Sequence, residues 1–347
     1  MGIFYDGTKL LSMKDLNGNT PEIIICTSNR SAGKTTFFSR MFVKKFLDNN
    51  EKFMLLYRYK YELHDCVDKF YAEIKKLFFP KHIMTSRMRG KGLYVELKLD
   101  DKICGYAIAL NSADNVKKYS HLFSDCKRIL FDEFQSEDNN YCSHEISKFI
   151  SIHTSIARGN GEQVRYLPIY MLSNNVSLVN PYYVELNILD RLTPEVNFLR
   201  GNGWVLEQGF NESASQKQEE SIFMQAFKNN DYVNYSKSKS YLNDNSNFIE
   251  KISGKNRYVL TLKYENKEYA IREFPELNLM YCDDKIDEQF PIRVAVTTDD
   301  HQVNYIMLKQ YYAIILTLKT YFERGFFRFK NQGCKSALIS TFKGVYN

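Results

Sequence analysis

The sequence predicts an α/β fold with a largely parallel sheet, followed by a smaller α+β domain. In the first half, short apolar runs of strand length alternate with segments of helical periodicity, as in strand–helix–strand units. From about residue 209 the chain turns polar, and short strand-like runs follow. We therefore expect a domain at 1–208, a linker region at 209–247 and a second domain at 248–347.

The expected elements of the first domain follow its apolar pattern. Runs of strand length lie at 22–26, 53–57, 128–131 and 166–172, and 93–110 is expected to form a hairpin with a short turn. Helical periodicity marks the segments 35–47, 61–78 and 143–157. In such an arrangement the carboxyl ends of the strands meet at one edge of the sheet, where ligands bind.

The elements after residue 208 are different. Residues 211–227 are expected to form one amphipathic helix, and the polar run 228–247 a linker or exposed loops. The apolar runs at 257–264, 267–274 and 277–282 predict an antiparallel meander. A long helix at about 302–324 and a basic tail are expected to close the chain.

Composition narrows the class of protein. The net charge of +6 permits a polyanionic partner without requiring one. The seven cysteines show no C-x-x-C spacing, so we expect free thiols in a reducing compartment rather than a zinc or disulfide scaffold. The N-terminus does not resemble a signal peptide. The apolar run 305–322 contains Lys309, Gln310 and Lys319, which favours a buried helix over a membrane span.

The run "CTSNRSAGKT" (26–35) is a candidate phosphate-binding loop because it lies between an expected strand and an expected helix. It ends in Gly-Lys-Thr, but Ser28 replaces the usual first glycine. Lys34 would reach the phosphates, the hydroxyl of Thr35 would bind Mg²⁺, and backbone N–H groups would hold the nucleotide. The alternative is a simple helix cap. The candidate nucleotide-binding residues are Ser28, Asn29, Arg30, Ser31, Ala32, Gly33, Lys34, Thr35 and Thr36.

A second motif, "RILFDEF", ends a buried strand with Asp132 and Glu133. Asp132 is a candidate Mg²⁺ ligand, and Glu133 a candidate general base that activates water. The alternative is an acidic pair that caps the next helix. Together with the upstream loop, this motif predicts a P-loop ATPase domain of the hydrolysing type, with an additional strand and a catalytic Glu, and with ATP and Mg²⁺ as cofactors.

A third strand ends in "IYMLSNN", which places Ser173 and Asn174 at the same predicted edge. These small polar side chains could sense the γ-phosphate or orient water, and Asn174 is the candidate catalytic residue. The alternative is an ordinary turn.

Taken together, these residues resemble the DNA packaging ATPases, or encapsidation proteins, of small protein-primed tailed phages. The resemblance extends over almost the full chain. It is carried by "SNRSAGKT", "EKFMLLYRYKYEL", "ILFDEF", "MLSNNVSLVNPYY" and "GFFRFKNQ". It implies an ATPase domain, a small linker, and an RNase H-like C-terminal domain without nuclease activity.

The resemblance also implies a function and partners. The family works as a homopentameric ring on the portal vertex of a prohead, and a structural RNA lies between portal and ATPase. The expected activity is therefore ATP-driven translocation of double-stranded DNA. The expected location is the host cytoplasm, with transient attachment to the prohead, no place in the mature virion and no membrane association.

The same resemblance assigns further site residues. Arg158 corresponds to an arginine finger that completes the site of a neighbouring subunit, and Arg165 is the alternative. Lys60, and Lys117 or Lys118, correspond to pore-facing lysines that contact DNA phosphates. Without the resemblance, each of these would be an ordinary solvated side chain.

The C-terminal domain offers a separate surface. The strand 257–264 contains no Asp, and Asp283 and Asp284 are expected in a turn, so a two-metal nuclease site is not predicted. The last residues contain cations without a nearby acid in sequence, which predicts an RNA- or portal-facing surface or a generic basic tail. These cations are Arg324, Arg328, Lys330, Lys335 and Lys343.

Two other functions fit parts of this pattern. A helicase-like ring ATPase would share the phosphate loop and the acidic pair. A non-catalytic nucleic-acid-binding scaffold with a decayed site is disfavoured, because Lys34, Thr35, Asp132 and Glu133 are all present.

Overall fold

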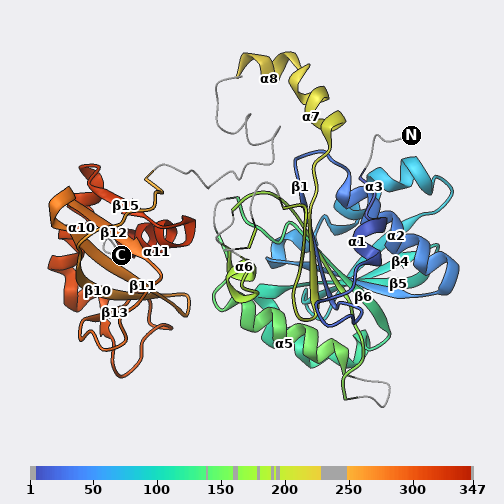
Figure 1. Ribbon diagram of the computed structural model, residues 1–347. Helices are drawn as coiled ribbons and strands as arrows, with labels where there is room; N and C mark the ends of the chain where they lie inside the picture. The colour runs from blue at the N-terminus through green and yellow to red at the C-terminus, as the bar shows by residue number, and fades with distance from the viewer. Residues whose placement is uncertain are drawn as a thin grey trace. The chain divides into compact units, whose positions relative to one another are not determined.

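We describe the protein from a computed structural model, which covers residues 5–137, 140–158, 163–177, 180–188, 191–192, 196–227 and 248–344. The chain forms two compact units (Figure 1). The first comprises Met1–Ser177 and Asp190–Asn243, and the second Leu178–Leu189 and Asp244–Asn347. The predicted linker segment 228–247 lies outside the described residues.

The first unit is built on one sheet with the strand order β3-β4-β5-β2-β6-β7-β1-β9-β8. The strands are β1 (Ile23–Ser28), β2 (Lys52–Tyr57), β3 (Met84–Arg89), β4 (Tyr94–Leu99), β5 (Lys102–Ala109), β6 (Cys126–Asp132), β7 (Ile169–Asn174), β8 (Phe198–Arg200) and β9 (Trp204–Gln208). From β5 to β9 all neighbours are parallel, and antiparallel partners flank this centre on both sides. The predicted parallel sheet is confirmed. Because β7 lies between β1 and β6, the sheet has the additional strand of the hydrolysing P-loop fold.

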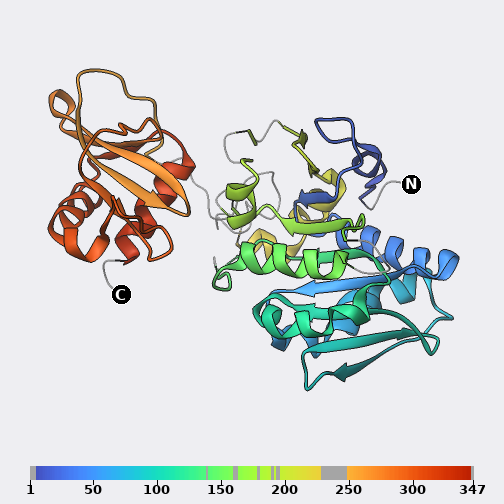
Figure 2. The ribbon, with the colours of Figure 1, turned by 90° about the horizontal axis from the view of Figure 1, so that it is seen from below.

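Helices cover both faces of this sheet. They are α1 (Thr8–Ser12), α2 (Lys34–Asn49), α3 (Cys66–Phe78), α4 (Ala113–Val116) and α5 (Glu145–Ala157). On one face α2 and α3 pack Phe38, Phe42 and Phe70 into a core with strand residues such as Phe53 and Leu130. On the other face Phe149 of α5 packs against Phe131 of β6, with ring centroids 6.2 Å apart. Figure 2 shows α5 lying along this face. Strands with two covered faces are apolar throughout, which is why they could be predicted as continuous runs.

The hairpin predicted at 93–110 is formed by β4 and β5. Its turn places Asp100 and Asp101 at φ 49° and 63°, the left-handed conformation that a two-residue hairpin turn needs. The sheet also contains β3, which was not predicted. Its sequence, MTSRMR, is mostly polar, because β3 is the edge strand and exposes one side to water.

Two predicted helices are interrupted. The segment 61–78 starts as a short 3-10 turn, η1 (Lys60–Leu63), and continues as α3. The single helix predicted at 211–227 was wrong, because the structure has two short helices there, α7 (Glu212–Glu219) and α8 (Ile222–Ala226). Ser221 separates them with an extended backbone, at φ −66° and ψ 125°.

The second unit is an α+β structure around a sheet with the order β14-β13-β10-β11-β12-β15. Its elements are α6 (Pro181–Glu185), β10 (Arg257–Tyr264), β11 (Lys267–Phe274), β12 (Leu279–Asp283), β13 (Arg293–Ala295), β14 (Ile306–Met307), α10 (Tyr312–Glu323), β15 (Phe327–Phe329) and α11 (Gln332–Gly344). The antiparallel meander β10–β11–β12 is confirmed. Two parallel strands extend it beside β10, as in an RNase H-like sheet.

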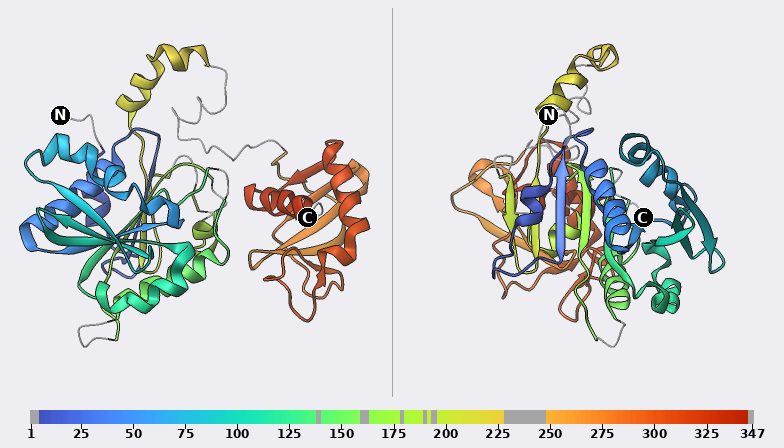
Figure 3. Two further views of the ribbon diagram at one scale, coloured as in Figure 1. Left: turned by 180° about the vertical axis from the view of Figure 1, so that it is seen from behind. Right: turned by 90° about the vertical axis from the view of Figure 1, so that its right-hand side faces the viewer.

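The end of the chain differs from its prediction. The expected helix 302–324 begins only at Tyr312, because Ile306 and Met307 pair with β13 instead. The expected basic tail is an ordered strand and helix, β15 and α11. Figure 3 shows α10 and α11 beside the sheet, and both contribute side chains to the same core.

Two further expectations concern compartment and membrane. All seven cysteines are free thiols, and all except Cys142 are buried. Among the helices of the described residues, none is long and apolar enough to cross a membrane.

Candidate nucleotide site

The candidate phosphate loop joins the end of β1 to the start of α2. Ser31 and Gly33 adopt left-handed conformations, with φ of 60° and 93°, and produce the turn into the helix. Ser28 is the last residue of β1, pairs in register with Asn174, and keeps an ordinary negative φ. The first position of the motif therefore does not need glycine here, because the left-handed conformations fall on later residues.

Lys34, which is buried, and Asp132, which is half-buried, form the charged centre of the site. Lys34 donates a hydrogen bond of 2.8 Å to the amide oxygen of Asn174. Burial lowers the pKa of Lys34, although the nearby Asp132 carboxylate opposes this shift. Burial likewise raises the pKa of Asp132 to about 6, an effect that Lys34 and the Thr35 hydroxyl reduce and Glu133 increases. Burial therefore disfavours the charged forms of both side chains. An anion beside Lys34 and a cation beside Asp132 would offset this cost.

The residues present fit Mg²⁺ and a nucleotide. The hydroxyl of Thr35 and the carboxylate of Asp132 are close enough to share a hydrogen bond, and both are the hard oxygen ligands that Mg²⁺ prefers. The start of α2 supplies backbone N–H groups for an anion, and Lys34 supplies a positive charge beside them. Asp132 could therefore hold a metal ion, and Lys34 could bind phosphate.

Glu133 follows directly after β6 in a left-handed conformation, with φ 56°. Its own N–H donates to Asp132 at 3.0 Å, and its carboxylate is exposed. A non-glycine residue in this conformation costs free energy and needs support from its surroundings. The side chain is thereby directed into a cleft of about 310 Å³, where it could reach a water molecule.

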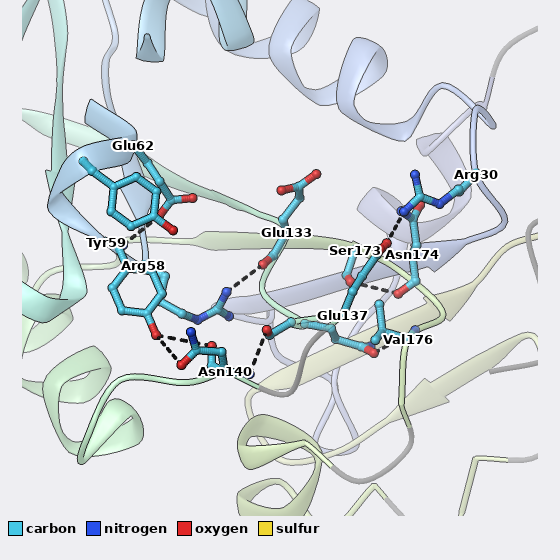
Figure 4. A pocket seen from close by; sticks show the side chains of 13 residues that line it. Arg30, Arg58, Tyr59, Glu62, Glu133, Glu137, Asn140, Ser173, Asn174 and Val176 are labelled. Atoms are coloured by element: carbon cyan, nitrogen blue, oxygen red, sulfur yellow. Dashed lines mark hydrogen bonds and ion pairs between the residues drawn. The ribbon is translucent and has the colours of Figure 1, made fainter. Parts of the chain in front are cut away.

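Arg58 gives that support, and the sequence analysis did not identify it. Its buried guanidinium donates to the backbone carbonyl of Glu133 (Figure 4) and to that of Phe134. Its Nε donates to both carboxylate oxygens of Glu145 at 3.1 Å. Glu145 is itself buried and also accepts the N–H of Cys142 at 2.9 Å. The only signal in the sequence was an arginine directly after a buried strand, since its partner lies 87 residues away.

Arg30 and Glu137 form an ion pair across the cleft (Figure 4). Arg30 belongs to the phosphate loop, and Glu137 follows the acidic pair of β6. Ser173 and Asn174 line the same cleft from the end of β7. The three predicted strand ends, at β1, β6 and β7, are therefore brought together as expected.

The phosphate loop is also tied to the start of the linker region. The Asn29 side-chain amide donates to the carbonyl of Asn211 at 3.1 Å, and the Asn29 amide oxygen accepts the Asn211 N–H at 2.9 Å. The side chain of Asn211 donates in turn to the carbonyl of Ala32 at 3.3 Å. Asn29 and Ala32 are buried, so both act as structural members of the loop. Thr36 lies in the first turn of α2.

The two candidate finger arginines differ in their surroundings. Arg158 is exposed at the C-cap of α5, which runs back from the active-site edge of the sheet. It is therefore remote from Glu133 of its own chain. Arg165 is buried, and its guanidinium donates to the carbonyl of Ile156 at 3.0 Å in the last turn of α5.

The three candidate DNA-binding lysines follow the carboxyl ends of β2 and β5. Lys60 begins η1 and is exposed, and its N–H donates to the side chain of Asn111 at 3.0 Å. Lys117 begins another 3-10 segment, η3 (Lys117–Phe123), and pairs with Asp114 at 3.1 Å. Lys118 is exposed beside it. Lys60 lies at the same edge of the sheet as Glu133, whereas Lys117 lies near Ile152 and Ser155 of α5.

Two cations of the predicted basic surface at the C-terminus form ion pairs with acids. Arg328 pairs with Glu250 at 2.6 Å, and Lys330 pairs with Asp284. Lys335 is buried. Segments distant in sequence thus supply acidic partners that the local sequence lacked, while the side chain of Lys343 lies outside the described residues.

The sequence predicts Asp283 in a turn, but the structure places it as the last residue of β12. Its carboxylate pairs with Arg272 at 2.8 Å and accepts the N–H of Lys285 at 2.7 Å. This acid is therefore already neutralised within the chain.

Comparison with known proteins agrees with this geometry. The family model of the podovirus DNA encapsidation protein (Gp16) matches residues 1–345. The DNA packaging protein of Bacillus phage phi29 is 26% identical over 347 residues, which cover 98% of this chain and 97% of that protein. The DNA packaging protein of Bacillus phage B103 is 26% identical over 323 residues, or 90% of this chain and 94% of that protein.

Solved structures show the same fold. A chain of the bacteriophage Phi-29 viral genome packaging motor assembly superposes with a TM-score of 0.71 at 24% identity, covering 99% of this chain and 100% of that chain. A chain of the Phi-28 gp11 DNA packaging motor gives a TM-score of 0.60 at 17% identity, covering 99% and 98%. With a family match over nearly its whole length, the chain belongs to the podovirus DNA encapsidation protein family.

Proposed function

We propose that this chain is an ATPase that drives double-stranded DNA into a phage prohead. The observation that carries the proposal is the convergence of Lys34, Asp132, Glu133 and Asn174 at one sheet edge in a member of the encapsidation family. Three features of the described geometry support it: a loop suited to phosphates, the Asp132 carboxylate suited to a metal ion, and the exposed Glu133 carboxylate suited to activating water.

Each residue has a defined part in hydrolysis. The loop Ser28–Lys34 and the N-terminus of α2 bind the phosphates of ATP, and Thr35 and Asp132 hold Mg²⁺. Bound Mg²⁺ would neutralise charge on the phosphates. Glu133 accepts a proton from the attacking water, and its backbone is held in place by Arg58.

Asn174 links the phosphates to the rest of the sheet. In the described state it accepts the only hydrogen bond observed from the Lys34 ammonium among the described residues. Phosphate oxygens would compete with Asn174 for Lys34, so nucleotide binding would free the amide to orient water or to sense the γ-phosphate. Arg30 would exchange Glu137 for phosphate in the same way.

Hydrolysis is proposed to require a neighbouring subunit. Arg158 is exposed and remote from its own Glu133, which supports a role in trans, whereas Arg165 is occupied at the end of α5. A closed ring supplies every site with a neighbour, and we propose the homopentameric ring of the related packaging proteins. Its partners would be the portal of the prohead, double-stranded DNA and a structural packaging RNA.

The second unit is proposed to bind the portal or RNA without nuclease activity. Asp283 and Asp284 are engaged by Arg272 and Lys330, which supports a structural role for these acids. The protein would work in the host cytoplasm, attached to the prohead only during packaging.

The test is ATP-dependent protection of DNA from nuclease inside purified proheads. Wild-type protein is expected to protect DNA, and the Glu133→Gln variant to bind ATP without protection. Preferential turnover on free forked DNA, with no response to proheads, would favour a helicase-like motor instead. Absence of ATP hydrolysis under all conditions would indicate a non-catalytic scaffold.

A further inference from the structure

The turn between β3 and β4 lies at the active-site edge of the sheet. Tyr94 at the start of β4 pairs with Ile108 near the end of β5, and Arg89 at the end of β3 pairs with Tyr94. Because β5 runs parallel to β2, with Ala109 opposite Tyr57, the turn 90–93 is at the edge where β2 ends. In Figure 2 this hairpin forms the outer margin of the sheet of the first unit.

This turn contacts the candidate DNA-binding residue Lys60 and, at its other end, Tyr119, the neighbour of Lys117 and Lys118 in sequence. A Cβ atom added to Gly92 would lie 3.3 Å from Nζ of Lys60, so the ammonium lies against the turn. On the other side, a Cβ atom added to Gly90 would lie 3.3 Å from the ring of Tyr119. Tyr119 follows Lys117 and Lys118 directly in η3. The turn therefore lies between Lys60 and the η3 segment that contains Lys117 and Lys118.

The turn has a fixed conformation that presents a lysine at its tip. Gly90, Lys91 and Gly92 all have left-handed backbones, with φ of 57°, 56° and 83°. The N–H groups of Gly92 and Leu93 both donate to the carbonyl of Arg89, at 3.0 and 3.1 Å. Lysine in this conformation is uncommon and costs free energy, which the two flanking glycines and these hydrogen bonds offset.

The side chains around the turn are mainly cationic. Arg87 and Lys91 are exposed, and Arg89 is half-buried, with its guanidinium 3.4 Å from Glu96. Acids also lie on these elements: Glu62 in η1, Glu96, which pairs with Arg89, and Asp114, which pairs with Lys117. Cations on an edge strand can serve only to prevent edge-to-edge pairing, which would explain Arg87. That role does not explain a lysine fixed at the tip of the turn, against Lys60.

From this juxtaposition we propose that Arg87, Arg89 and Lys91 extend the surface formed by Lys60, Lys117 and Lys118, and that they bind the phosphate backbone of duplex DNA. The inference rests on the proposed function, since it names further residues for the same partner. A surface of flexible cations around a rigid turn suits phosphates, which are contacted without regard to base sequence. Its position beside the end of β2 would connect DNA contact to Arg58 and Glu133.

The test compares two variants that each remove two positive charges. Arg87→Gln/Lys91→Gln removes exposed cations of the proposed surface, and Lys44→Gln/Lys45→Gln removes two exposed lysines of α2 as a matched control. Binding to a short fluorescent duplex of random sequence is measured by anisotropy at several salt concentrations. Each lost phosphate contact should lower the salt slope by about 0.9, so only the first variant should lower it, by roughly two.

The remaining outcomes separate this inference from the proposed function. If Lys60→Gln lowers the slope and Arg87→Gln/Lys91→Gln does not, the turn does not contact DNA and the inference fails alone. If wild-type protein binds no duplex DNA with any nucleotide, the proposed function fails together with the inference. If the double variant loses affinity only for an RNA duplex, the partner of this surface is RNA and the inference is wrong. In the absence of DNA, the Arg87→Gln/Lys91→Gln variant should hydrolyse ATP at the wild-type rate.

Discussion

In the described part of the chain, β6 and β12 each end in an acid that is followed directly by a second acid, and the two pairs have opposite surroundings. In the second unit, Asp283 and Asp284 at the end of β12 pair with Arg272 and Lys330. In the first unit, Asp132 at the end of β6 has a raised pKa, because burial outweighs the attraction of Lys34. Glu133 beside it is exposed to the cleft.

The difference shows how a structural pair can be told from a functional one. The β12 pair finds its counter-charges within the chain, so it needs no ligand. Lys34 beside the β6 pair does not offset the burial of Asp132, so this pair could take a further positive charge from outside, such as a metal ion. From sequence alone, an acidic pair at a strand end can be structural or functional. The charges that surround the pair in the fold distinguish the two.

The largest effect is expected from removing Arg158, the positive charge that a neighbouring subunit is proposed to supply. Arg158→Ala should preserve ATP binding and lower turnover of a uniform assembly on the order of 10³-fold, because an arginine finger stabilises the transferring phosphoryl group. Mixing Arg158→Ala subunits with Glu133→Gln subunits should partly restore turnover. Steady-state ATPase assays of the uniform and mixed assemblies measure both effects.

Arg165→Ala is the matched control for this experiment. Its side chain donates a hydrogen bond to the end of α5, so the change should lower the melting temperature. The turnover of the protein that remains folded should change little. Wild-type turnover in Arg158→Ala together with a large loss in Arg165→Ala would move the finger to Arg165. If neither variant loses turnover, this loop supplies no finger.

The next largest effect should come from the water-activating acid. Glu133→Gln should keep ATP affinity and lower turnover roughly 10²-fold or more, the usual contribution of a general base. Lys34→Ala should instead weaken nucleotide binding itself. Asp284→Asn changes an equivalent acid at the end of β12 and should leave turnover unchanged. Nucleotide binding by a fluorescent ATP analogue, measured beside turnover, separates these cases; near-normal turnover in Glu133→Gln would remove this residue from the mechanism.

A smaller loss is expected from the residue that positions Glu133. Arg58→Lys keeps the charge beside Glu145 but cannot reproduce the fork that reaches Glu145 and two carbonyls together. Misplacing the Glu133 backbone should lower turnover by about ten- to a hundredfold, with ATP affinity unchanged. Equal losses in affinity and turnover, or a large fall in melting temperature, would mean that Arg58 only stabilises the fold.

The central site could be predicted because its signals are local. Asp132 and Asn174 end apolar strands, Lys34 follows the loop after another, and parallel strands bring such ends together. The partners of these residues could not be predicted, since Arg58 and Glu145 meet only through the fold. Edge strand β3 escaped detection because its exposed side chains carry no apolar alternation.

The C-terminal errors have the same cause. Cations without acids nearby in sequence suggested a free basic surface, but Glu250 and Asp284 reach Arg328 and Lys330 from other segments. Similarly, Ile306 and Met307 fit a helical pattern, yet pairing with β13 overrides it. Contacts between distant segments determine the structure at these positions, and local sequence patterns do not reveal such contacts.

The smallest expected effect tests the pair that needs no ligand. Asp283→Asn removes a largely buried partner of Arg272, so the second unit should lose about 1–3 kcal/mol of stability, with ATP turnover unchanged. Asp284→Asn removes a more exposed partner of Lys330 and should cost less, about 0–1 kcal/mol. The only tryptophan, Trp204, lies buried in β9 of the first unit, so its fluorescence reports on that unit alone. In urea, Asp283→Asn should therefore move the transition seen by far-UV circular dichroism and leave the tryptophan transition in place. If turnover or nucleotide affinity falls with Asp283→Asn, this pair is not self-contained, and the contrast with Asp132 and Glu133 does not hold.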